Sequence, residues 1–289
     1  MYPILFEFGS VTIYSLWFFV TVGFVVGSIV FTNLCKHNRV AINLFTENAF
    51  SIFLTGLIFG RLTYILFHWS FFFFSYGMQE WLGLFGIWDK GFSFWGTLAG
   101  VLFALYRKRN STEEPIMALI DQLVPAVLVG MMFGEFGAFL DGSLYGSPTT
   151  LPWGVVFKSA YVKYISPIHP TQIYALIYTT LTMILMLHLL KKSRSATVHG
   201  IVTEICITIM SAFFFIEEFF RGDEVFTVFG IRIGIYTSAV IFICGTLMLR
   251  KRIVNPDLKD PDGILRWLTS VRRKLMAKLH SKSENLPVQ

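Results

Sequence analysis

The chain has 289 residues, of which 54% are hydrophobic and only 15% are charged, whereas soluble domains carry about 25% charged residues. This composition excludes an ordinary soluble domain and indicates a surface covered by lipid. The net charge of +6 does not indicate nucleic-acid binding, because the basic residues cluster in short loops and the sequence has no DNA- or RNA-binding motif.

Apolar segments of membrane-spanning length recur along the chain. About 20 apolar helical residues cross the hydrocarbon layer, and irregular chain facing lipid would leave its backbone groups without partners. Seven segments fit this requirement, at residues 11–35, 43–67, 92–106, 118–138, 172–190, 200–220 and 229–249. The third is short, so it either extends into residues 88–91 or is partly re-entrant. The sequence therefore predicts an all-α integral membrane protein built as a seven-transmembrane helix bundle.

The basic residues give this bundle a direction. Eighteen Lys and Arg residues fall in the loops after the first, third and fifth segments and in the chain after the seventh, and five fall in the other loops. Cytoplasmic loops of membrane proteins are enriched in Lys and Arg. We therefore expect the N-terminus outside the cytoplasm and the C-terminus inside. Residues 1–10 contain Glu7 but no Lys or Arg, so a cleavable signal peptide is not expected.

The predicted domains are a membrane domain at residues 1–250 and a basic cytoplasmic tail at 251–289. Apolar residues recur at helical spacing in the tail, at Ile264, Leu268, Val271, Leu275 and Leu279, with Lys and Arg between them. This pattern predicts an amphipathic helix on the anionic cytoplasmic leaflet, the alternative being a solvated tail without a partner. Two long external loops, 68–91 and 139–171, are expected at the outer leaflet, and the second has the composition of an ordered loop.

Polar residues gather near the predicted outer ends of the segments, although an ionisable group inside a span costs roughly 2.5–3.5 kcal/mol. They are Arg61, Tyr64, Asp89, Glu135, Asp141, His169, Gln172, Tyr174, Glu217, Glu218, Arg221 and Arg232. Their convergence at one depth is typical of a pocket for a charged headgroup, in which Arg binds phosphate through two parallel hydrogen bonds.

Each of these residues also has a structural alternative. Arg61 is equally suited to an ion pair with Glu135 or Glu47 that packs two helices. His169 is compatible with a structural role at the interface, and Glu218 and Arg221 are spaced to pair with each other. The glycines between 130 and 146, Gly137 among them, favour either tight helix packing or close approach of the backbone to a ligand.

The stretch Gly-Glu-Phe-Gly-Ala-Phe-Leu-Asp-Gly-Ser-Leu-Tyr-Gly at 134–146 resembles the prolipoprotein diacylglyceryl transferase signature, Gly-Arg-x-Gly-Asn-Phe-x-Asn-x-Glu-x-x-Gly. Other blocks of the family occur in the same order. They are Glu47-Asn48, Gly60-Arg61-x-x-Tyr64, Trp88-Asp89-x-Gly91-x-Ser93-Phe94-x-Gly96, His169-Pro170-Thr171-Gln172-x-Tyr174 and Glu218-Phe219-Phe220-Arg221. Tyr14 resembles the tyrosine of the family's first span, and the likeness covers about residues 10–250.

The resemblance implies transfer of the diacylglyceryl group of phosphatidylglycerol to the lipobox cysteine thiol of a preprolipoprotein. A thioether forms and glycerol phosphate leaves. The resemblance also implies a multi-pass protein of the bacterial cytoplasmic (inner) membrane. The implied partners are phosphatidylglycerol or a related anionic phospholipid and the preprolipoprotein signal peptide, with no nucleic acid. No cofactor and no metal ion are expected.

The resemblance also implies roles for individual residues. The substrate-binding candidates are Arg61, Tyr64, Asp89, Trp95, Gly137, Gln172, Tyr174, Glu218 and Arg221, and the catalytic candidates are His169, Asp141, Glu135 and Tyr14. Arg221 and Arg61 would hold the phosphate, since a leaving phosphate needs cationic stabilisation. The thiol must lose its proton, because a free cysteine has a pKa of about 8.5. The general base would be His169 or one of the carboxylates Glu135 and Asp141.

The chain departs from the family at several polar positions. Glu135 stands where the signature has arginine, and Trp95 stands where the family has a histidine after Ser-Phe. The remaining replacements are Ala138, Asp141, Ser143 and Ala175. Two functions therefore compete: a divergent diacylglyceryl transferase, and a non-catalytic or re-purposed paralogue that binds phospholipid or signal-peptide helices. A transporter or channel is disfavoured, because the charges gather at one leaflet and do not mark a path across the bilayer.

Overall fold

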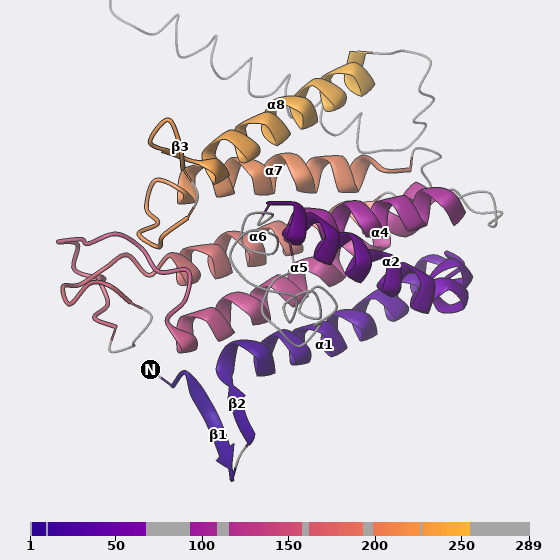
Figure 1. The fold of residues 1–289 in the computed structure, drawn as a ribbon. Coiled ribbons are helices and arrows are strands. Elements are labelled where there is room, and N and C mark those ends of the chain that lie inside the picture. The colour runs from indigo at the N-terminus through magenta and orange to yellow at the C-terminus, as the bar shows by residue number, and fades with distance from the viewer. Residues whose placement is uncertain are drawn as a thin grey trace, which may run out of the picture. The chain divides into compact units, whose positions relative to one another are not determined.

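The computed structural model describes residues 2–9, 11–67, 93–108, 116–157, 162–192, 199–225 and 227–254. Within these ranges the chain forms helices joined by loops and two short hairpins (Figure 1). The helices are α1 (Ser15–Asn38), α2 (Asn43–Phe67), α4 (Phe94–Lys108), α5 (Ile116–Asp141), α6 (Thr171–Lys192), α7 (Ile201–Glu217) and α8 (Ile233–Val254). The predicted aromatic loop 68–91 and the predicted amphipathic helix of the tail lie outside the described residues.

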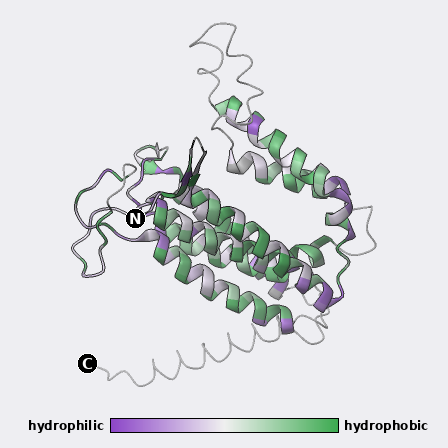
Figure 2. Cartoon of the chain, turned by 90° about the horizontal axis from the view of Figure 1, so that it is seen from below, coloured by the Kyte–Doolittle hydropathy of each residue, from purple (hydrophilic) through white to green (hydrophobic). Residues whose placement is uncertain are grey.

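Five of these helices, α1, α2, α5, α6 and α8, are long and apolar enough to cross a membrane. Figure 2 shows hydrophobic residues along the helices and hydrophilic residues toward their ends. The other two, α4 and α7, have 15 and 17 described residues. Each of the seven apolar segments overlaps one helix, so the prediction of a multi-pass helical membrane protein is confirmed. The number of spans and the side of each terminus stay predictions.

The all-α prediction missed two hairpins. β1 (Ile4–Phe8) pairs with β2 (Val11–Tyr14), so the first helix begins at Ser15 and not at residue 11. Tyr14, expected in the first span, is instead the last residue of β2. The second hairpin joins β3 (Thr227–Val228) to β4 (Ile231–Arg232), which delays α8 to Ile233. These apolar, β-branched and aromatic residues suit a strand as well as a span, and the pairing across each tight turn is a tertiary feature.

The chain divides into two compact units, and each is described separately. One unit comprises Arg39–Leu119 and contains α2 and α4. These two helices approach closely at Gly100, where a Cβ atom would lie 2.6 Å from the Thr55 carbonyl oxygen and 2.7 Å from the Phe59 Cβ. The Ser93 amide donates to the Gly60 carbonyl at 3.0 Å, which ties the start of α4 to the residue before Arg61.

The other unit comprises Met1–Asn38 and Ile120–Gln289. In it α1 and α5 approach through small residues. A Cβ atom on Gly23 would lie 2.8 Å from the Phe133 Cβ, and one on Gly137 would lie 3.1 Å from the Leu16 Cα. Gly137 is buried in this contact. Its described surroundings therefore fit the helix-packing alternative better than a role in ligand contact.

The N-terminus of α7 is capped by a carboxylate from α5. Asp121 is buried and accepts hydrogen bonds from the Gly200 amide at 2.7 Å, the Thr203 amide at 2.9 Å and the Thr203 hydroxyl at 2.6 Å. The first amides of a helix have no partner within the helix, so this side chain satisfies groups that would otherwise be buried without one. The cap fixes the N-terminus of α7 against α5, at the opposite end of these helices from the candidate site described below.

We expect Asp121→Ala to lower the free energy of unfolding by about 2 kcal/mol, because it removes the cap and leaves two buried amides unsatisfied. Unfolding of the purified protein in mixed detergent micelles measures this change. Asp121→Asn keeps one acceptor oxygen and should lose less. Equal stability of Asp121→Ala and the unmodified protein would contradict the capping role.

Candidate functional site

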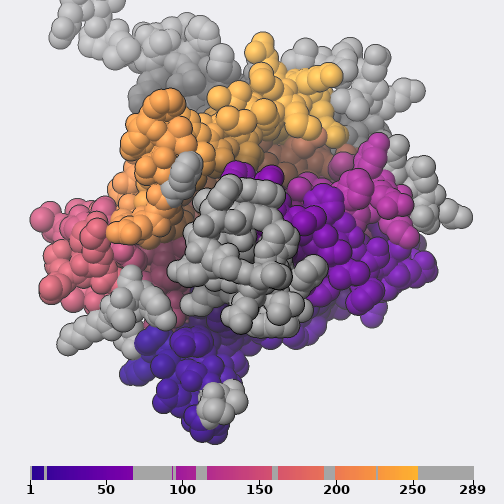
Figure 3. All heavy atoms as spheres, viewed as in Figure 1, coloured from indigo at the N-terminus to yellow at the C-terminus, as the bar shows by residue number. Residues whose placement is uncertain are grey.

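The C-terminal ends of α5 and α7 and the N-terminal end of α6 are joined by backbone hydrogen bonds between three loop segments; on the predicted orientation this is the outer end of the bundle. The Gly146 amide donates to the His169 carbonyl at 3.1 Å, and the His169 amide donates to the Ser147 carbonyl at 3.0 Å. On the other side, the Ser147 amide donates to the Phe220 carbonyl at 2.8 Å. Figure 3 shows the pink and orange atoms of the loops after α5 and α7 side by side. The described part of the loop after α5 is thus tied by backbone hydrogen bonds to the segments before α6 and after α7.

Glycine is required where these segments cross. A Cβ atom on Gly146 would lie 2.6 Å from the His169 Cβ and still closer to the His169 carbonyl oxygen. A Cβ atom on Gly222 would lie 2.5 Å from the Gly146 carbonyl oxygen. This close stacking places His169 and Arg221, which lie 52 positions apart in the sequence, on either side of Gly146.

His169 is buried, and its ring is linked by polar contacts first to Tyr174 and then to Trp153. Its Nδ1 lies 3.2 Å from the Tyr174 hydroxyl, which also accepts a hydrogen bond from Trp153 Nε1 at 2.7 Å. The His169 ring also contacts the Phe220 ring, with centroids 5.2 Å apart. Tyr174 therefore holds the imidazole from one side, and the loop residue Trp153 holds Tyr174.

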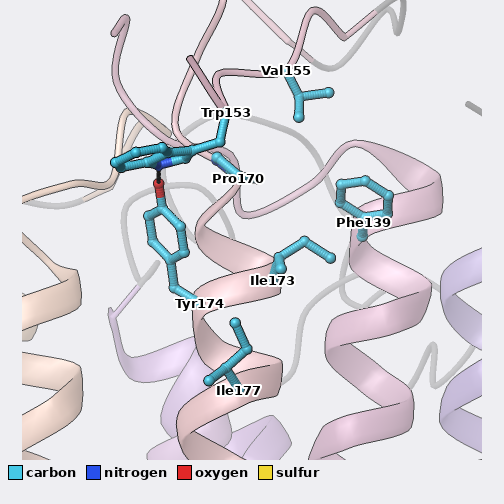
Figure 4. A pocket seen from close by; sticks show the side chains of 7 residues that line it. All are labelled: Phe139, Trp153, Val155, Pro170, Ile173, Tyr174 and Ile177. Carbon is cyan, nitrogen blue, oxygen red and sulfur yellow. Dashed lines mark hydrogen bonds between the residues drawn. The ribbon is translucent and has the colours of Figure 1, made fainter. Parts of the chain in front are cut away.

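An apolar pocket of about 430 Å³ lies beside Tyr174 (Figure 4). Phe139 of α5 and Ile173 of α6 point into the space between the two helices, and Val155 approaches from the loop. Trp153 and Ile177 stand at its edge and are exposed, so the pocket opens to the outside.

Two arginines and two carboxylates form a closed network after α7. Arg221 donates from Nε and Nη2 to the two oxygens of Asp223 at 3.0 and 2.6 Å. Arg232 donates from Nε to Glu218 at 2.6 Å and from Nη2 to Asp223 at 2.8 Å. Only 14 to 17% of each of these side chains is exposed. The predicted Glu218–Arg221 pair is the weakest link, with an N–O distance of 3.9 Å.

The network perturbs the acidity of Asp223. Burial raises the pKa of this carboxyl, but the hydrogen bonds and positive charges of Arg221 and Arg232 outweigh burial and hold the pKa below its usual range. Arg221 in turn has its pKa raised, since Asp223 outweighs the effect of burial on the guanidinium. The bidentate face of Arg221 is therefore matched to a carboxylate, a geometry that also suits a phosphate group.

A second acidic group lies deeper in the bundle. Tyr178 of α6 donates to Glu217 Oε2 at 2.5 Å, and both side chains are buried. Glu135 of α5 is within electrostatic range of Glu217 and Arg221. Glu135, at the position of the signature arginine, therefore lies near one carboxyl group and one guanidinium group, at and just after the end of α7.

The remaining α5 and α6 candidates lie where these helices meet. Gln172 is buried and donates from Nε2 to the Ser143 carbonyl at 2.5 Å, and the Thr171 hydroxyl donates to the Leu144 carbonyl at 2.6 Å. Thr171 thus ties the start of α6 to the loop after α5. Asp141 is buried as the last residue of α5.

In the unit Arg39–Leu119, Arg61 is buried, and its guanidinium carbon lies 5.8 Å from the centroid of the Tyr64 ring. This is within the range of a cation–π contact. Asp89 lies outside the described residues, and Trp95 is described only as a backbone position in α4. The structure thus brings together His169, Gln172, Tyr174, Glu135, Glu218 and Arg221 within one unit, whereas the place of Arg61 and Tyr64 beside them stays a prediction.

Sequence reasoning missed three polar members of this site. Asp223 was detectable from its spacing, because Arg221 and Asp223 are two residues apart in a polar loop. Tyr178 follows Tyr174 at helical i, i+4 spacing, which places both rings on one face of α6. Trp153 gave no local signal, since only the fold of its loop brings the indole to Tyr174.

The chain was compared with protein families and with known proteins. A family model for prolipoprotein diacylglyceryl transferase matches residues 3–250. A protein of Wolbachia pipientis subsp. Culex pipiens is 28% identical over 255 residues, covering 85% of this chain and 93% of the relative. A protein of Wolbachia sp. subsp. Drosophila simulans is 30% identical over 228 residues, covering 77% and 82%. A Geobacter sulfurreducens protein is 33% identical over 176 residues, covering 61% and 64%.

All three relatives are named phosphatidylglycerol–prolipoprotein diacylglyceryl transferase. The match begins just before the first hairpin, ends within α8 and includes every loop that builds the candidate site. The resemblance first carried by the blocks around Gly134, His169 and Arg221 therefore extends over nearly the whole chain, which belongs to the prolipoprotein diacylglyceryl transferase family.

Proposed function

We propose that this protein transfers the diacylglyceryl group of phosphatidylglycerol to the lipobox cysteine of a preprolipoprotein. The observation that carries this proposal is the joining of His169 and Arg221 across Gly146, at the outer end of a bundle that matches the transferase family over residues 3–250. A basic group and a cationic group at one site are what the reaction requires.

The bonds that form and break in this reaction give a role to both His169 and Arg221. The cysteine sulfur bonds to a glyceryl carbon, and the bond from this carbon to the phosphate oxygen breaks. The oxygen leaves with the electron pair as glycerol phosphate, and Arg221, with Arg61, stabilises its charge. The thiol proton passes to His169, held by Tyr174, or to Glu135 or Asp141. Tyr14 is a further proposed catalytic residue, and the proposed substrate site is completed by Tyr64, Asp89, Trp95, Gln172 and Glu218.

The proposed setting is the bacterial inner membrane, with seven spans, the N-terminus outside and the C-terminus inside. The excess of Lys and Arg in alternate loops supports this orientation. It places His169 and Arg221 at the outer leaflet, where a signal-peptide helix would present its lipobox cysteine. The preprolipoprotein signal peptide is therefore the proposed protein partner, and residues 251–289 the proposed cytoplasmic tail.

A second candidate function is binding of phospholipid or a signal-peptide helix without catalysis. Two observations favour it. Glu135 puts a carboxylate where the family signature has arginine, and Asp223 already binds both donor positions of Arg221 that a phosphate would take. On this hypothesis the scaffold still binds lipid but does not stabilise the leaving phosphate.

Incubation of the purified protein with labelled phosphatidylglycerol and a lipobox peptide distinguishes the two candidate functions. The proposed enzyme forms lipidated peptide and releases glycerol phosphate, and an active family member run in parallel validates the assay. If the protein forms neither product while the control forms both, the enzyme hypothesis is rejected and the binding function remains.

We expect the double substitution Glu135→Arg and Trp95→His to raise the rate of lipidation by about tenfold, because it restores a cation for the developing charge and an imidazole. The initial rate of glycerol phosphate release is the measurement. Glu7→Arg makes the same change of charge at an exposed residue of β1 that has no proposed role in the reaction, and it serves as the matched control. A double variant no faster than the unmodified protein would show that these two positions do not limit the reaction.

A further inference from the structure

The apolar pocket beside Tyr174 has no part in the bond changes proposed above. Carbon atoms of Phe139, Val155 and Ile173 form its wall. The polar atoms at its edge, Trp153 Nε1 and the Tyr174 hydroxyl, are hydrogen-bonded to each other. A buried polar group without a partner costs free energy, so this lining selects an occupant made of hydrocarbon.

The mouth of the pocket continues into an exposed apolar stripe on α6. Ile177 at the mouth is 55% exposed, and Leu181 and Ile184 below it are 59% and 56% exposed. Residues at this spacing share one face of a helix. Since α6 has the length and composition of a membrane span, this face meets lipid chains, and the pocket is a recess at the outer end of a lipid-contacting surface.

The size of the pocket favours a chain over a helix. About 430 Å³ is in the range of small-molecule sites, whereas an α-helix with its side chains is about 10–12 Å across and needs a groove between elements. A signal-peptide helix therefore fits the recess poorly, and a single flexible hydrocarbon chain fits it well.

We propose that this pocket binds one acyl chain of the phospholipid donor. The inference rests on the proposed function, because it is the transferase that needs to position a diacylglyceryl group. The Tyr174 hydroxyl, at the pocket edge, lies 3.2 Å from His169 Nδ1, so a chain seated here keeps its ester end beside the imidazole. The pocket thus orients the donor, while Arg221 holds its phosphate.

The test uses the full chain in nanodiscs with phosphatidylglycerol that carries a diazirine in the upper half of one acyl chain. After irradiation, mass spectrometry locates crosslinked peptides. Crosslinks are expected on the segments that contain Phe139, Trp153 and Ile173. The variant Ile177→Trp narrows the mouth and should reduce these crosslinks by about tenfold, since it denies the chain the burial of about two methylenes.

Ile184→Trp is the matched control, because it makes the same change on the same stripe at nearly the same exposure, away from the pocket. It should leave the crosslinks unchanged. Ile173→Trp fills the wall itself, and its melting temperature shows whether it folds. Equal crosslinking in Ile177→Trp and Ile184→Trp, or pocket crosslinks from a photoreactive lipobox peptide and not from the lipid, overturns the proposal.

The lipidation assay separates failure of this inference from failure of the proposed function. Pocket crosslinks without lipidated peptide leave the acyl site standing and reject the transferase. Lipidated peptide without pocket crosslinks rejects the acyl site and leaves the transferase standing.

Discussion

Replacing Gly146 with alanine is expected to lower the rate of lipidation by about 100-fold, because it displaces His169 relative to Arg221. The added Cβ would lie 2.6 Å from the His169 Cβ and closer still to the His169 carbonyl oxygen. Backbone atoms cannot rotate away as the end of a side chain does, so the segments must separate. Initial rates with labelled phosphatidylglycerol and a lipobox peptide measure the effect.

Gly130→Ala is the matched control for this substitution. Within the described residues, the atom nearest to its added Cβ is the Gly23 carbonyl oxygen at 3.8 Å, an ordinary contact distance. Alanine within a helix is more favourable than glycine by roughly 0.5–1 kcal/mol, so this variant should be as active and at least as stable as the unmodified protein. Full activity in Gly146→Ala would mean that the crossing of these segments does not set the geometry of the site.

The membrane helices could be predicted because hydrophobic length is a local property. The segment 43–67 coincides with α2, and the segment 172–190 lies within α6 (Thr171–Lys192). The errors fall at the starts of the first and last segments, where residues 11–14 and 229–232 belong to hairpins. Hydropathy cannot separate an apolar strand from the start of an apolar helix, since both contain the same residue types.

The polar site could be predicted only as a set of residue types at one depth. His169, Gln172 and Arg221 were identifiable because polar residues recur at the same predicted end of several spans. Their partners were not, because partner choice depends on how loops fold. Arg221 lies three residues from Glu218, yet it binds Asp223 through two hydrogen bonds, while Glu218 binds Arg232 from the far side of a hairpin.

The same limit applies to glycine. Gly137 and Gly146 belong to one signature stretch, and both were equally compatible with packing or with ligand contact. The structure gives them different neighbours. Gly137 meets α1, whereas Gly146 meets the backbone of His169 and Gly222. A local sequence pattern predicts that a side chain would be harmful at such a position, but only the fold says which contact it would break.

Asp223→Asn is expected to lower the free energy of unfolding by about 3 kcal/mol, because it leaves Arg221 and Arg232 sharing Glu218 as their one ionised partner in the described network. These side chains are mostly buried, so water compensates the lost charge poorly. Asparagine preserves the shape of the side chain but has one acceptor oxygen and no charge. Unfolding in mixed detergent micelles at neutral pH measures the loss.

Glu224→Gln is the matched control, since it makes the same chemical change at the next residue. Glu224 pairs with Lys163 at 3.0 Å, but the two side chains are 80% and 64% exposed, and exposed pairs contribute little. No measurable loss is therefore expected. If both variants lost the same stability, charge at this loop in general, and not the arginine network, would be responsible.

The pH dependence follows from the lowered pKa of Asp223. A carboxyl whose pKa is lower in the folded than in the unfolded protein stabilises the fold fully above its unfolded value, about 3.9, and loses this contribution as the pH falls through the folded value. The melting temperatures of the unmodified protein and Asp223→Asn should therefore differ by a constant amount from pH 7 to about pH 5 and converge below about pH 4. Convergence already between pH 5 and pH 7 would mean that Asp223 is protonated in the network, and that its charge does not hold Arg221 and Arg232 together.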